Sequence, residues 1–425
     1  MIDDFLSSKI TQFQKVLVPD VINFIWIGDV ISLNYNYINL WADTNKDKEI
    51  HLWCDDCTGK CALLHDAIHR YVRVNVYHDQ IEAEKNIRNR AFCFIFNKLK
   101  EGFLFDDLVE DFLRNNNIPY NENQGKSLFP KFKNASVKLK SISNIFSGGF
   151  SVFMKYYYYE LILRGNLASA SDIARLLIIY RYGGIYIDVD VLPNTHNIFK
   201  SYNDFMKSKN YTERDQISLF KTISLLRKIT LIEYEQGKIP DYPNGIADLE
   251  CQHSDVIYSL IESDIAGFHI DDILPLGKIY VYKDLLSLGT DKRLKGIYFN
   301  CFIASHPQSR VIKIILRTMA KRYNFLESNN AIFDFYTGKN HYCYLARLLP
   351  WRSELITRDY CVTSILTGPG LIVEVLLGLA YSLFKIDDAI NPSYISGLMQ
   401  DDRLGIAFSN LNLNTPDAMR STWRQ

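Results

Sequence analysis

Two carboxylates and a tyrosine alternate along a short apolar segment, Ile185-Tyr-Ile-Asp-Val-Asp-Val191. Because side chains alternate between the two faces of a strand, this pattern predicts that Tyr186, Asp188 and Asp190 point to one side. Charge inside an otherwise apolar strand is costly without a partner. Carboxylate oxygens suit Mg²⁺ or Mn²⁺ better than zinc, and the oxygens of a bound diphosphate would complete the coordination.

Such a site could transfer a sugar from a nucleotide diphosphate. The cation would neutralise charge on the departing diphosphate, so that the bond between the sugar C1 and its oxygen breaks without a protonated leaving group. Two acids separated by one residue are weak evidence alone, because such pairs are common and usually face solvent. The apolar context is what favours a functional site.

A second pair of charged residues lies on a predicted helix. Asp172 and Arg175 are three residues apart, so they share one helix face and are close enough to touch. The other faces of this helix are apolar, which favours a polar edge directed at a cleft over an exposed surface ion pair. In a cleft, the arginine would bind a phosphate and the carboxylate would bind sugar hydroxyls.

Alternating strands and helices must position these residues. The apolar run Val21–Gly28 is typical of a buried strand, and Glu49–Asp56 is a second predicted strand that ends in two carboxylates. The helical pattern between them predicts a right-handed crossover in a parallel sheet. A helix over Ser169–Tyr180, ended by Gly183 and Gly184, leads into the strand that carries both acids. We therefore expect an α/β fold.

The remaining segments suggest how the chain is organised. A short N-terminal helix is expected within residues 1–20, ended by Pro19, and a single domain within residues 21–425. The polar composition of residues 109–148 predicts an insertion in this domain. Residues 200–296 are expected to form a helical region on the acceptor side.

Composition narrows the class of protein. The chain has 425 residues, with 48 Lys and Arg against 48 Asp and Glu, and 48% of its residues are hydrophobic. It can form a large core, which excludes wholesale disorder. The balanced charge gives no general basic field, so nucleic acid is not indicated as a partner. The apolar run Gly370–Phe384 falls short of the roughly 20 residues that cross a bilayer, and it predicts a buried helix rather than a transmembrane segment.

The cysteines and the N-terminal residues indicate the type of cellular compartment in which the protein acts. Eight cysteines are few for this length, and two acids stand where a secretory signal needs positive charge, so we expect a reducing compartment and no cleaved signal peptide. Cys54, Cys57, Cys61 and His65 have zinc-type ligands at close spacing, but a predicted strand end and helix favour structural roles, and zinc stays open. Tyr156–Tyr159 favour core packing over an acceptor platform, because consecutive tyrosines point all round a helix.

Four blocks of the sequence resemble the catalytic domain of the large clostridial glucosylating toxins, in the same order and with matching spacing. These blocks are Phe24–Gly28, Asn166–Arg175, Gly183–Pro193 and Ser421–Trp423. The resemblance extends more loosely to sugar transferases that share the DxD region. It implies a GT-A fold with a mostly parallel central sheet and helical insertions, and retaining transfer from a UDP-hexose with Mn²⁺ or Mg²⁺.

The resemblance also implies a role for each matching residue. Trp26 would stack on uracil, Asp172 and Arg175 would hold the sugar, and Ser421 and Trp423 would close over the diphosphate. Metal ligation is expected from Asp190 and Ser421. The expected donor-binding residues are Ile25, Trp26, Leu167, Ser171, Asp172, Arg175, Tyr186, Asp188, Val189, Asn300, Ser421 and Trp423. The expected catalytic residues are Asp172, Arg175, Asp188, Asp190, Asn300 and Trp423.

Three features depart from the family's pattern. Ala418 stands where the family has a further metal-binding glutamate, so water or Asp417 would fill that coordination position. Phe299 and Cys301 replace the residues whose bulk helps the family to choose between glucose and N-acetylglucosamine, and both sugars stay open. The family's N-terminal membrane-docking bundle is reduced to the short helix before Val21.

We therefore expect a bacterial toxin or effector, secreted or injected, that acts in the host cytosol. Its donor would be a UDP-sugar, and its acceptor a hydroxyl side chain of a host protein, with a Rho/Ras-type small GTPase as the target that the resemblance suggests. One alternative is a polysaccharide or lipid-linked glycosyltransferase. A non-catalytic UDP-sugar-binding module is the other.

Overall fold

The computed structural model describes residues 14–28, 35–55, 59–121, 136–213, 215–235, 255–291, 294–330 and 362–409, together with residues 8, 33 and 332. Two residues with predicted roles, Ser421 and Trp423, lie outside this part of the chain, as do Asp417 and Ala418. Their roles stay predictions.

A seven-stranded mixed sheet forms the centre of the molecule, with strand order β4-β3-β2-β5-β8-β7-β9. The strands β4, β3, β2 and β5 run parallel, whereas β8 is antiparallel to both of its neighbours. The predicted parallel pair is confirmed, because Val21 to Trp26 pair in register with Glu49 to Cys54. The strands are β2 (Val21–Trp26), β3 (Glu49–Cys54), β4 (Val137–Ser141), β5 (Gly184–Ile187), β7 (Ser287–Thr290), β8 (Tyr298–Ser305) and β9 (Ala407–Phe408).

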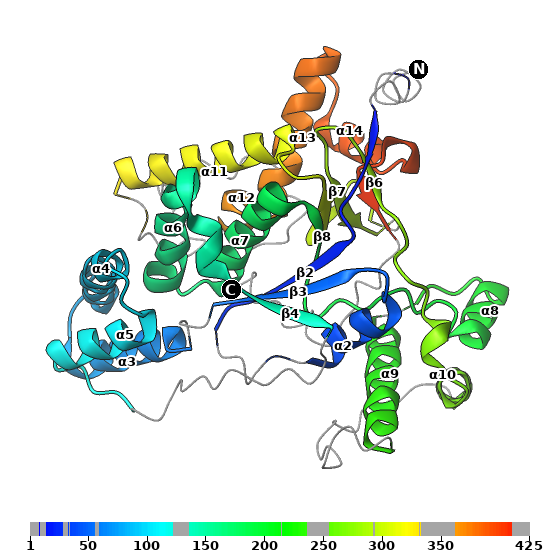
Figure 1. Ribbon diagram of the computed structural model, residues 1–425, viewed down its shortest axis with the longest axis horizontal. Coiled ribbons are helices and arrows are strands. Elements are labelled where there is room, and N and C mark those ends of the chain that lie inside the picture. Colours follow the sequence, from blue (N-terminus) through cyan, green and yellow to red (C-terminus); the bar gives the residue numbers. More distant parts are fainter. Residues whose placement is uncertain are drawn as a thin grey trace.

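Helices pack on both faces of this sheet (Figure 1). On one face, Ile25 and Ile303 belong to a large apolar core with residues of four helices. These helices are α6 (Ser151–Tyr158), α7 (Leu167–Tyr182), α11 (Arg310–Ser328) and α13 (Pro369–Phe384). On the other face, Phe24 and Ile187 pack with Trp41 of α2 (Tyr35–Thr44). Strand residues therefore alternate between two cores, as the pleat of a sheet requires.

Two groups of helices extend from the sheet at opposite sides (Figure 1). The first group is α3 (Cys61–Asn75), α4 (Gln80–Leu99) and α5 (Phe105–Asn115), whose apolar faces join the larger core. The second group is α8 (Lys200–Ser208), α9 (Asp215–Glu235) and α10 (Asp255–Ala266), which share a separate core with α2. None of the described helices is long and apolar enough to span a membrane.

The N-terminal segment differs from its prediction where the structure describes it. Lys15–Leu17 forms the strand β1, which pairs antiparallel with β6 (Tyr280–Tyr282), so the expected helix does not reach these residues. Most of the expected helix lies outside the described residues. The segment is extended because its backbone groups pair with β6 rather than within a helix.

The predicted boundaries of two other regions also differ from the structure. Val109 is buried in α5, and Val137–Ser141 is the edge strand of the central sheet, so the expected insertion at 109–148 is shorter than its composition indicated. Its lysines alternate along an edge strand, where polar residues are common. The expected helical region at 200–296 gives way to strands β6 and β7 after α10 and a short 3₁₀ turn.

Gly184 allows β5 to start next to β2. Its φ is +94°, and a Cβ there would lie 2.8 Å from the carbonyl oxygen of Val21 and 3.0 Å from Nδ2 of Asn23. Both the backbone conformation and the contact exclude a larger residue. We expect Gly184→Ala to lower the free energy of unfolding by about 2–3 kcal/mol, measured by urea denaturation.

Gly378→Ala is the matched control for this change. Gly378 lies inside α13, and a Cβ there would meet nothing within 4 Å. Alanine should stabilise the helix by about 0.5–1 kcal/mol because it has the higher helix propensity. Equal effects of the two substitutions would contradict the close approach of β5 to β2.

Candidate active site

Asp188 and Asp190 lie directly after β5, at an edge of the sheet. The strand ends at Ile187, and the backbone N–H of Val191 donates to the Asp188 carbonyl at 3.1 Å in a turn. The predicted strand over 185–191 was therefore too long. Both acids lie in the turn and are partly exposed, which removes the cost of charge in a buried strand.

Hydrogen bonds join this turn to the neighbouring strand β8 and to the side chain of Tyr186. The backbone N–H of Asp188 donates to the carbonyl oxygen of Cys301 at 2.9 Å. The buried Tyr186 hydroxyl donates to Oδ1 of Asp188. Tyr186 and Asp188 thus point the same way, as predicted, although only Tyr186 is in the strand.

Helix α7 places Asp172 and Arg175 beside the turn that follows β5. Asn166 caps this helix by accepting the backbone N–H of Ser169 at 2.9 Å, and Gly183 ends it, as predicted. The two charged side chains form the predicted ion pair, with Nη2 of Arg175 3.3 Å from Oδ1 of Asp172. Both residues are buried, at 5% and 6% exposure, so the pair faces the protein interior and is not a surface ion pair.

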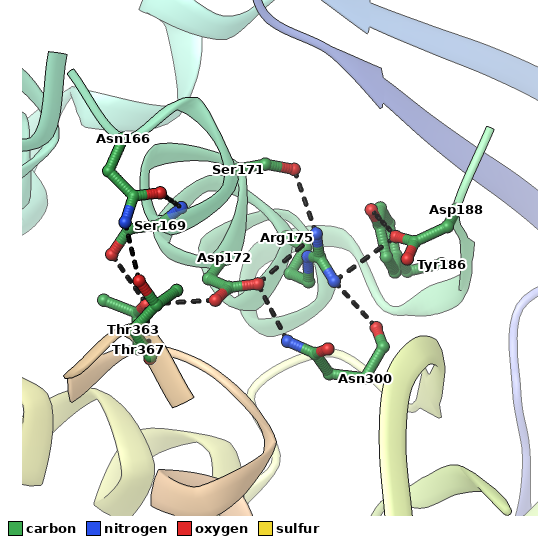
Figure 2. Close-up of polar contacts among 10 residues, drawn as sticks. All are labelled: Asn166, Ser169, Ser171, Asp172, Arg175, Tyr186, Asp188, Asn300, Thr363 and Thr367. Atoms are coloured by element: carbon green, nitrogen blue, oxygen red, sulfur yellow. Dashed lines mark hydrogen bonds and ion pairs between the residues drawn. The ribbon is translucent and has the colours of Figure 1, made fainter. Parts of the chain in front are cut away.

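Arg175 connects the three elements of the site, as Figure 2 shows. Its Nη1 donates to the carbonyl oxygen of Asn300 on β8 at 2.8 Å and lies 3.3 Å from Oδ1 of Asp188. Its Nη2 donates to the hydroxyl of Ser171 at 3.1 Å. The guanidinium also stacks on the Tyr186 ring, 4.3 Å from the ring centre. One planar cation therefore fixes α7, β8 and the turn after β5 relative to one another.

Both carboxylate oxygens of Asp172 accept hydrogen bonds. Nδ2 of Asn300 donates to Oδ1 at 2.8 Å, and the hydroxyl of Thr367 lies 3.0 Å from Oδ2 (Figure 2). Burial raises the pKa of Asp172 to about 6, although Arg175 and these two hydrogen bonds act to lower it. Asp172 is thus a carboxylate of fixed orientation whose charge changes not far below neutral pH.

The contribution of residues 363–370 was not predicted from the sequence. Thr367 follows the short helix α12 (Val362–Leu366), and Thr363 accepts a hydrogen bond from Nδ2 of Asn166 at 2.6 Å. Gly368 lets this turn approach the site, since a Cβ there would lie 3.2 Å from Oδ2 of Asp172. Gly368-Pro369-Gly370 is typical of a turn, but these residues do not indicate what the turn contacts.

The pKa of Asp172 predicts how donor use depends on pH. If Asp172 accepts hydrogen bonds from sugar hydroxyls, only its ionised form can do so. Because its pKa is raised to about 6, the ionised fraction falls as the pH falls through 6. We expect kcat/KM for donor hydrolysis to drop about tenfold per pH unit below this value.

Asp172→Asn is the control for this pH dependence. The amide does not titrate, so its residual activity should be flat where the wild type falls. If kcat/KM fell in the same way for both proteins as the pH is lowered, another group would control this pH dependence.

The other predicted donor-binding residues lie around this cluster with differing exposure. Trp26 ends β2 and is half-buried, whereas Ile25 is buried in the larger core. Leu167 begins α7 and approaches Gly28, whose added Cβ would meet it at 3.2 Å. Val189 is partly buried between the two acids. The structure thus places Trp26 at a strand end and Leu167 at a helix start, with Ile25 inside the core.

The described residues include one of the two expected ligands of a hard divalent cation, Asp190. Asp190 and Asp188 are the carboxylates in the turn, and Oδ1 of Asp188 is engaged by Arg175 and Tyr186. Within the described ranges, no group of three or more His, Cys, Asp or Glu could hold a metal ion without other ligands. Two carboxylates suit Mg²⁺ or Mn²⁺ when phosphate oxygens supply further ligands.

The cysteine and histidine cluster has a different arrangement. The Cys61 thiol and Nε2 of His65 both contact the carbonyl oxygen of Leu161, at 3.3 and 2.6 Å. Burial raises the pKa of Cys61 to about 12, which disfavours the thiolate that zinc needs. Cys54 is buried in the core, and Cys57 lies outside the described residues. Cys61 and His65 therefore support the backbone of the distant helical segment that contains Leu161.

The tyrosines at 156–159 pack inside the protein, as predicted. All four are buried, and the Tyr156 ring stacks on Tyr323 of α11, with ring centres 4.4 Å apart. The helix continues as the π-helical segment η4 (Tyr159–Arg164), which precedes α7. These residues therefore pack in the core, with Tyr156 against α11, rather than form a binding platform.

Comparison with known proteins shows which domains the chain is similar to. Residues 20–229 match the family model of the TcdA/TcdB catalytic glycosyltransferase domain. Toxin A of Clostridium novyi is 28% identical over 336 residues, which are 72% of this chain and 14% of that protein. Toxin B of Clostridioides difficile is 25% identical over 353 residues, which are 75% of this chain and 14% of that protein. The chain thus spans about 14% of the length of these relatives.

Solved structures confirm the predicted α/β fold of GT-A type. The catalytic domain of alpha-toxin from Clostridium novyi has a TM-score of 0.66 at 22% identity, covering 99% of this chain and 84% of that chain. The UDP-bound glycosyltransferase domain from the YGT toxin has a TM-score of 0.59 at 17% identity, covering 96% and 82%. At sequence identities this low, the similarity to these structures shows the fold alone.

Proposed function

Because residues 20–229 match the model of the TcdA/TcdB catalytic glycosyltransferase domain, we propose that the chain transfers a hexose from a UDP-sugar to a hydroxyl side chain of a host protein. The sugar would be glucose or N-acetylglucosamine, and the transfer would retain the anomeric configuration. The acceptor suggested by the family is a small GTPase of Rho/Ras type in the host cytosol.

One observation in the site carries this proposal. Arg175 and Asp172 of α7 meet Asp188 of the turn after β5 and Asn300 of β8, and both Asp188 and its neighbour Asp190 are partly exposed. A buried arginine with a fixed carboxylate suits a ligand that presents both phosphate oxygens and hydroxyls. A nucleotide-sugar presents both within a few ångströms.

Different residues of this site would bind the sugar and the diphosphate of the donor. Asp172 and Asn300 would orient the sugar hydroxyls, and Arg175 would offset the negative charge of the diphosphate. Asp190, with Ser421, would hold Mn²⁺ or Mg²⁺. When bound, this cation would neutralise charge on the leaving UDP.

Labelled donors test the proposed function. The purified protein is incubated with Mn²⁺ and radiolabelled UDP-glucose or UDP-N-acetylglucosamine, with and without a eukaryotic cytosolic extract. We expect slow hydrolysis of one donor and labelling of one protein band. Label in glycan or lipid would favour the polysaccharide or lipid-linked alternative. Measurable donor binding without any turnover would favour a non-catalytic binding module.

A further inference from the structure

Strand β8 has a bulge at the point where it contacts the charged pair of α7. Leu288 of β7 pairs with Ile303, but the next residue, Gly289, pairs with Phe299. The residues of β8 between these two pairs therefore form a bulge, which consists of Asn300, Cys301 and Phe302. Gly289 leaves room for this bulge, since an added Cβ would lie 3.2 Å from the carbonyl oxygen of Phe299. Bulges commonly redirect a side chain next to an active site.

The bulge explains how Asn300 contacts α7 with both its backbone and its side chain. In a regular strand, successive carbonyls point to opposite neighbouring strands. The carbonyl of Cys301 accepts the N–H of Asp188 after β5, so the carbonyl of Asn300 would be directed at β7. It instead accepts a hydrogen bond from Nη1 of Arg175 at 2.8 Å. At the same time, Nδ2 of Asn300 donates to Oδ1 of Asp172 at 2.8 Å (Figure 2).

The two ends of the bulge are held differently. After it, β8 pairs with β5 on one side and with β7 on the other. Before it, the first two residues of β8, Tyr298 and Phe299, pair with the last two residues of β7. Two residue pairs hold a strand end weakly, because strand ends fray unless tertiary contacts fix them. Contacts from outside these two strands must therefore fix the start of β8.

Gln400 binds the start of β8 with its whole amide group, although it lies 110 residues beyond Thr290 in the sequence. Its Oε1 accepts the backbone N–H of Gly296 at 2.7 Å. Its Nε2 lies 2.6 Å from the hydroxyl of Thr290, and 3.0 and 3.1 Å from the carbonyl oxygens of Leu294 and Ile297. Because Gly296 offers a donor and the two carbonyls offer only acceptors, the amide has a single favourable orientation.

Helix α14 (Pro392–Leu398), which precedes Gln400, binds the same segment. The hydroxyl of Ser396 donates to the carbonyl oxygen of Gly296 at 2.8 Å, and the hydroxyl of Tyr298 donates to the carbonyl oxygen of Ser396 at 3.1 Å. Ser396 and Tyr298 are buried, whereas Gln400 is only partly buried. Gln400 can therefore be substituted without a direct change to the core.

We propose that Gln400 is a positioning residue that holds the start of the β8 bulge and thereby keeps Asn300 in contact with the charged pair of α7. Its amide joins the last residue of β7 to the segment that precedes β8, so the two strands cannot separate or slide at this end. Asn300 acts on the reaction through donor binding, so the effect on catalysis rests on the proposed function.

Two substitutions of Gln400 and a control test the inference in the whole protein. Gln400→Leu removes the polar contacts at similar side-chain volume. Gln400→Glu keeps an acceptor for Gly296 but replaces the amide donor by an oxygen, which the backbone carbonyls repel. Gln80→Leu is the control, because Gln80 also donates to a backbone carbonyl, that of Val76 at 2.9 Å, but lies at the start of α4.

Donor hydrolysis should separate positioning from general stability. We expect both Gln400 variants to lower kcat/KM by about 10- to 100-fold, because a shift of about 1 Å in a site residue has effects of this size, and Gln80→Leu to stay within about threefold. In an Asn300→Ala protein, Gln400→Leu should have almost no further effect on kcat/KM, because the residue that it positions is already missing. Full activity of both Gln400 variants, or an undiminished loss in the Asn300→Ala protein, would overturn the inference.

A measurement without donor distinguishes this inference from the proposed function. In a crystal structure of Gln400→Leu, Nδ2 of Asn300 should lie beyond hydrogen-bond distance, about 3.5 Å or more, from Oδ1 of Asp172. The Gln80→Leu structure should keep this contact at 2.8 Å. An unchanged contact in Gln400→Leu would overturn the inference whether or not the protein is active. A displaced Asn300 in a protein without turnover would support the inference while the proposed function fails.

Discussion

Arg175→Lys is expected to reduce donor hydrolysis by roughly 10²–10³-fold while the protein stays folded. Lysine keeps the charge that Asp172 and Asp188 require, so neither acid is left without a cation. It cannot stack on Tyr186 or bond at once to the carbonyl of Asn300 and the hydroxyl of Ser171, as the guanidinium does. The measurements are kcat and KM for UDP-sugar hydrolysis, with the thermal unfolding temperature recorded in parallel.

Arg175→Met separates charge from geometry at the same position. Removing the cation from this buried pair should lower the free energy of unfolding by about 3–5 kcal/mol, because Asp172 is then buried without its partner. The lysine variant should lose much less stability than the methionine variant. If Arg175→Lys kept wild-type kcat/KM, the planar contacts of the arginine would have no part in the reaction.

The second large effect concerns the cation. Asp190→Asn should lower Mn²⁺-stimulated hydrolysis by roughly 10²–10³-fold, because an amide oxygen carries no charge to attract a divalent ion. The loss should be partly overcome at high Mn²⁺ concentration if the remaining ligands are intact. Activity as a function of Mn²⁺ concentration, at fixed UDP-sugar, measures this shift.

Asp388→Asn provides a control for loss of one surface carboxylate. Asp388 is exposed in the turn after α13 and is not among the residues of the site. Its substitution should leave both the maximum rate and the Mn²⁺ dependence unchanged. Unaltered activity in Asp190→Asn would remove Asp190 from the metal site.

The sequence pattern predicted the central part of the fold well, for identifiable physical reasons. Strand β2 is an almost unbroken apolar run because both faces of a parallel sheet are covered, and such runs are easy to recognise. Helix α7 ends at Gly183, as the sequence pattern predicted. The ion pair of Asp172 and Arg175 follows from helical spacing alone.

The parts that were not predicted depend on contacts between distant segments. Alternation could not show that β5 ends at Ile187, because the turn is fixed by the hydrogen bond from Asp188 to Cys301 of β8. Strand β4 is polar on its exposed side and looked like an insertion. Thr367 reaches Asp172 across 195 residues of sequence, and no local pattern indicates such a contact.

The most direct measurement of the central claim is a crystal structure with UDP-sugar and Mn²⁺, with the manganese located by its anomalous scattering. The manganese should bind a carboxylate oxygen of Asp190 and the diphosphate, with the hexose against Asp172, Arg175 and Asn300. A nucleotide bound elsewhere on the protein, or a manganese ion distant from Asp190, would contradict the account.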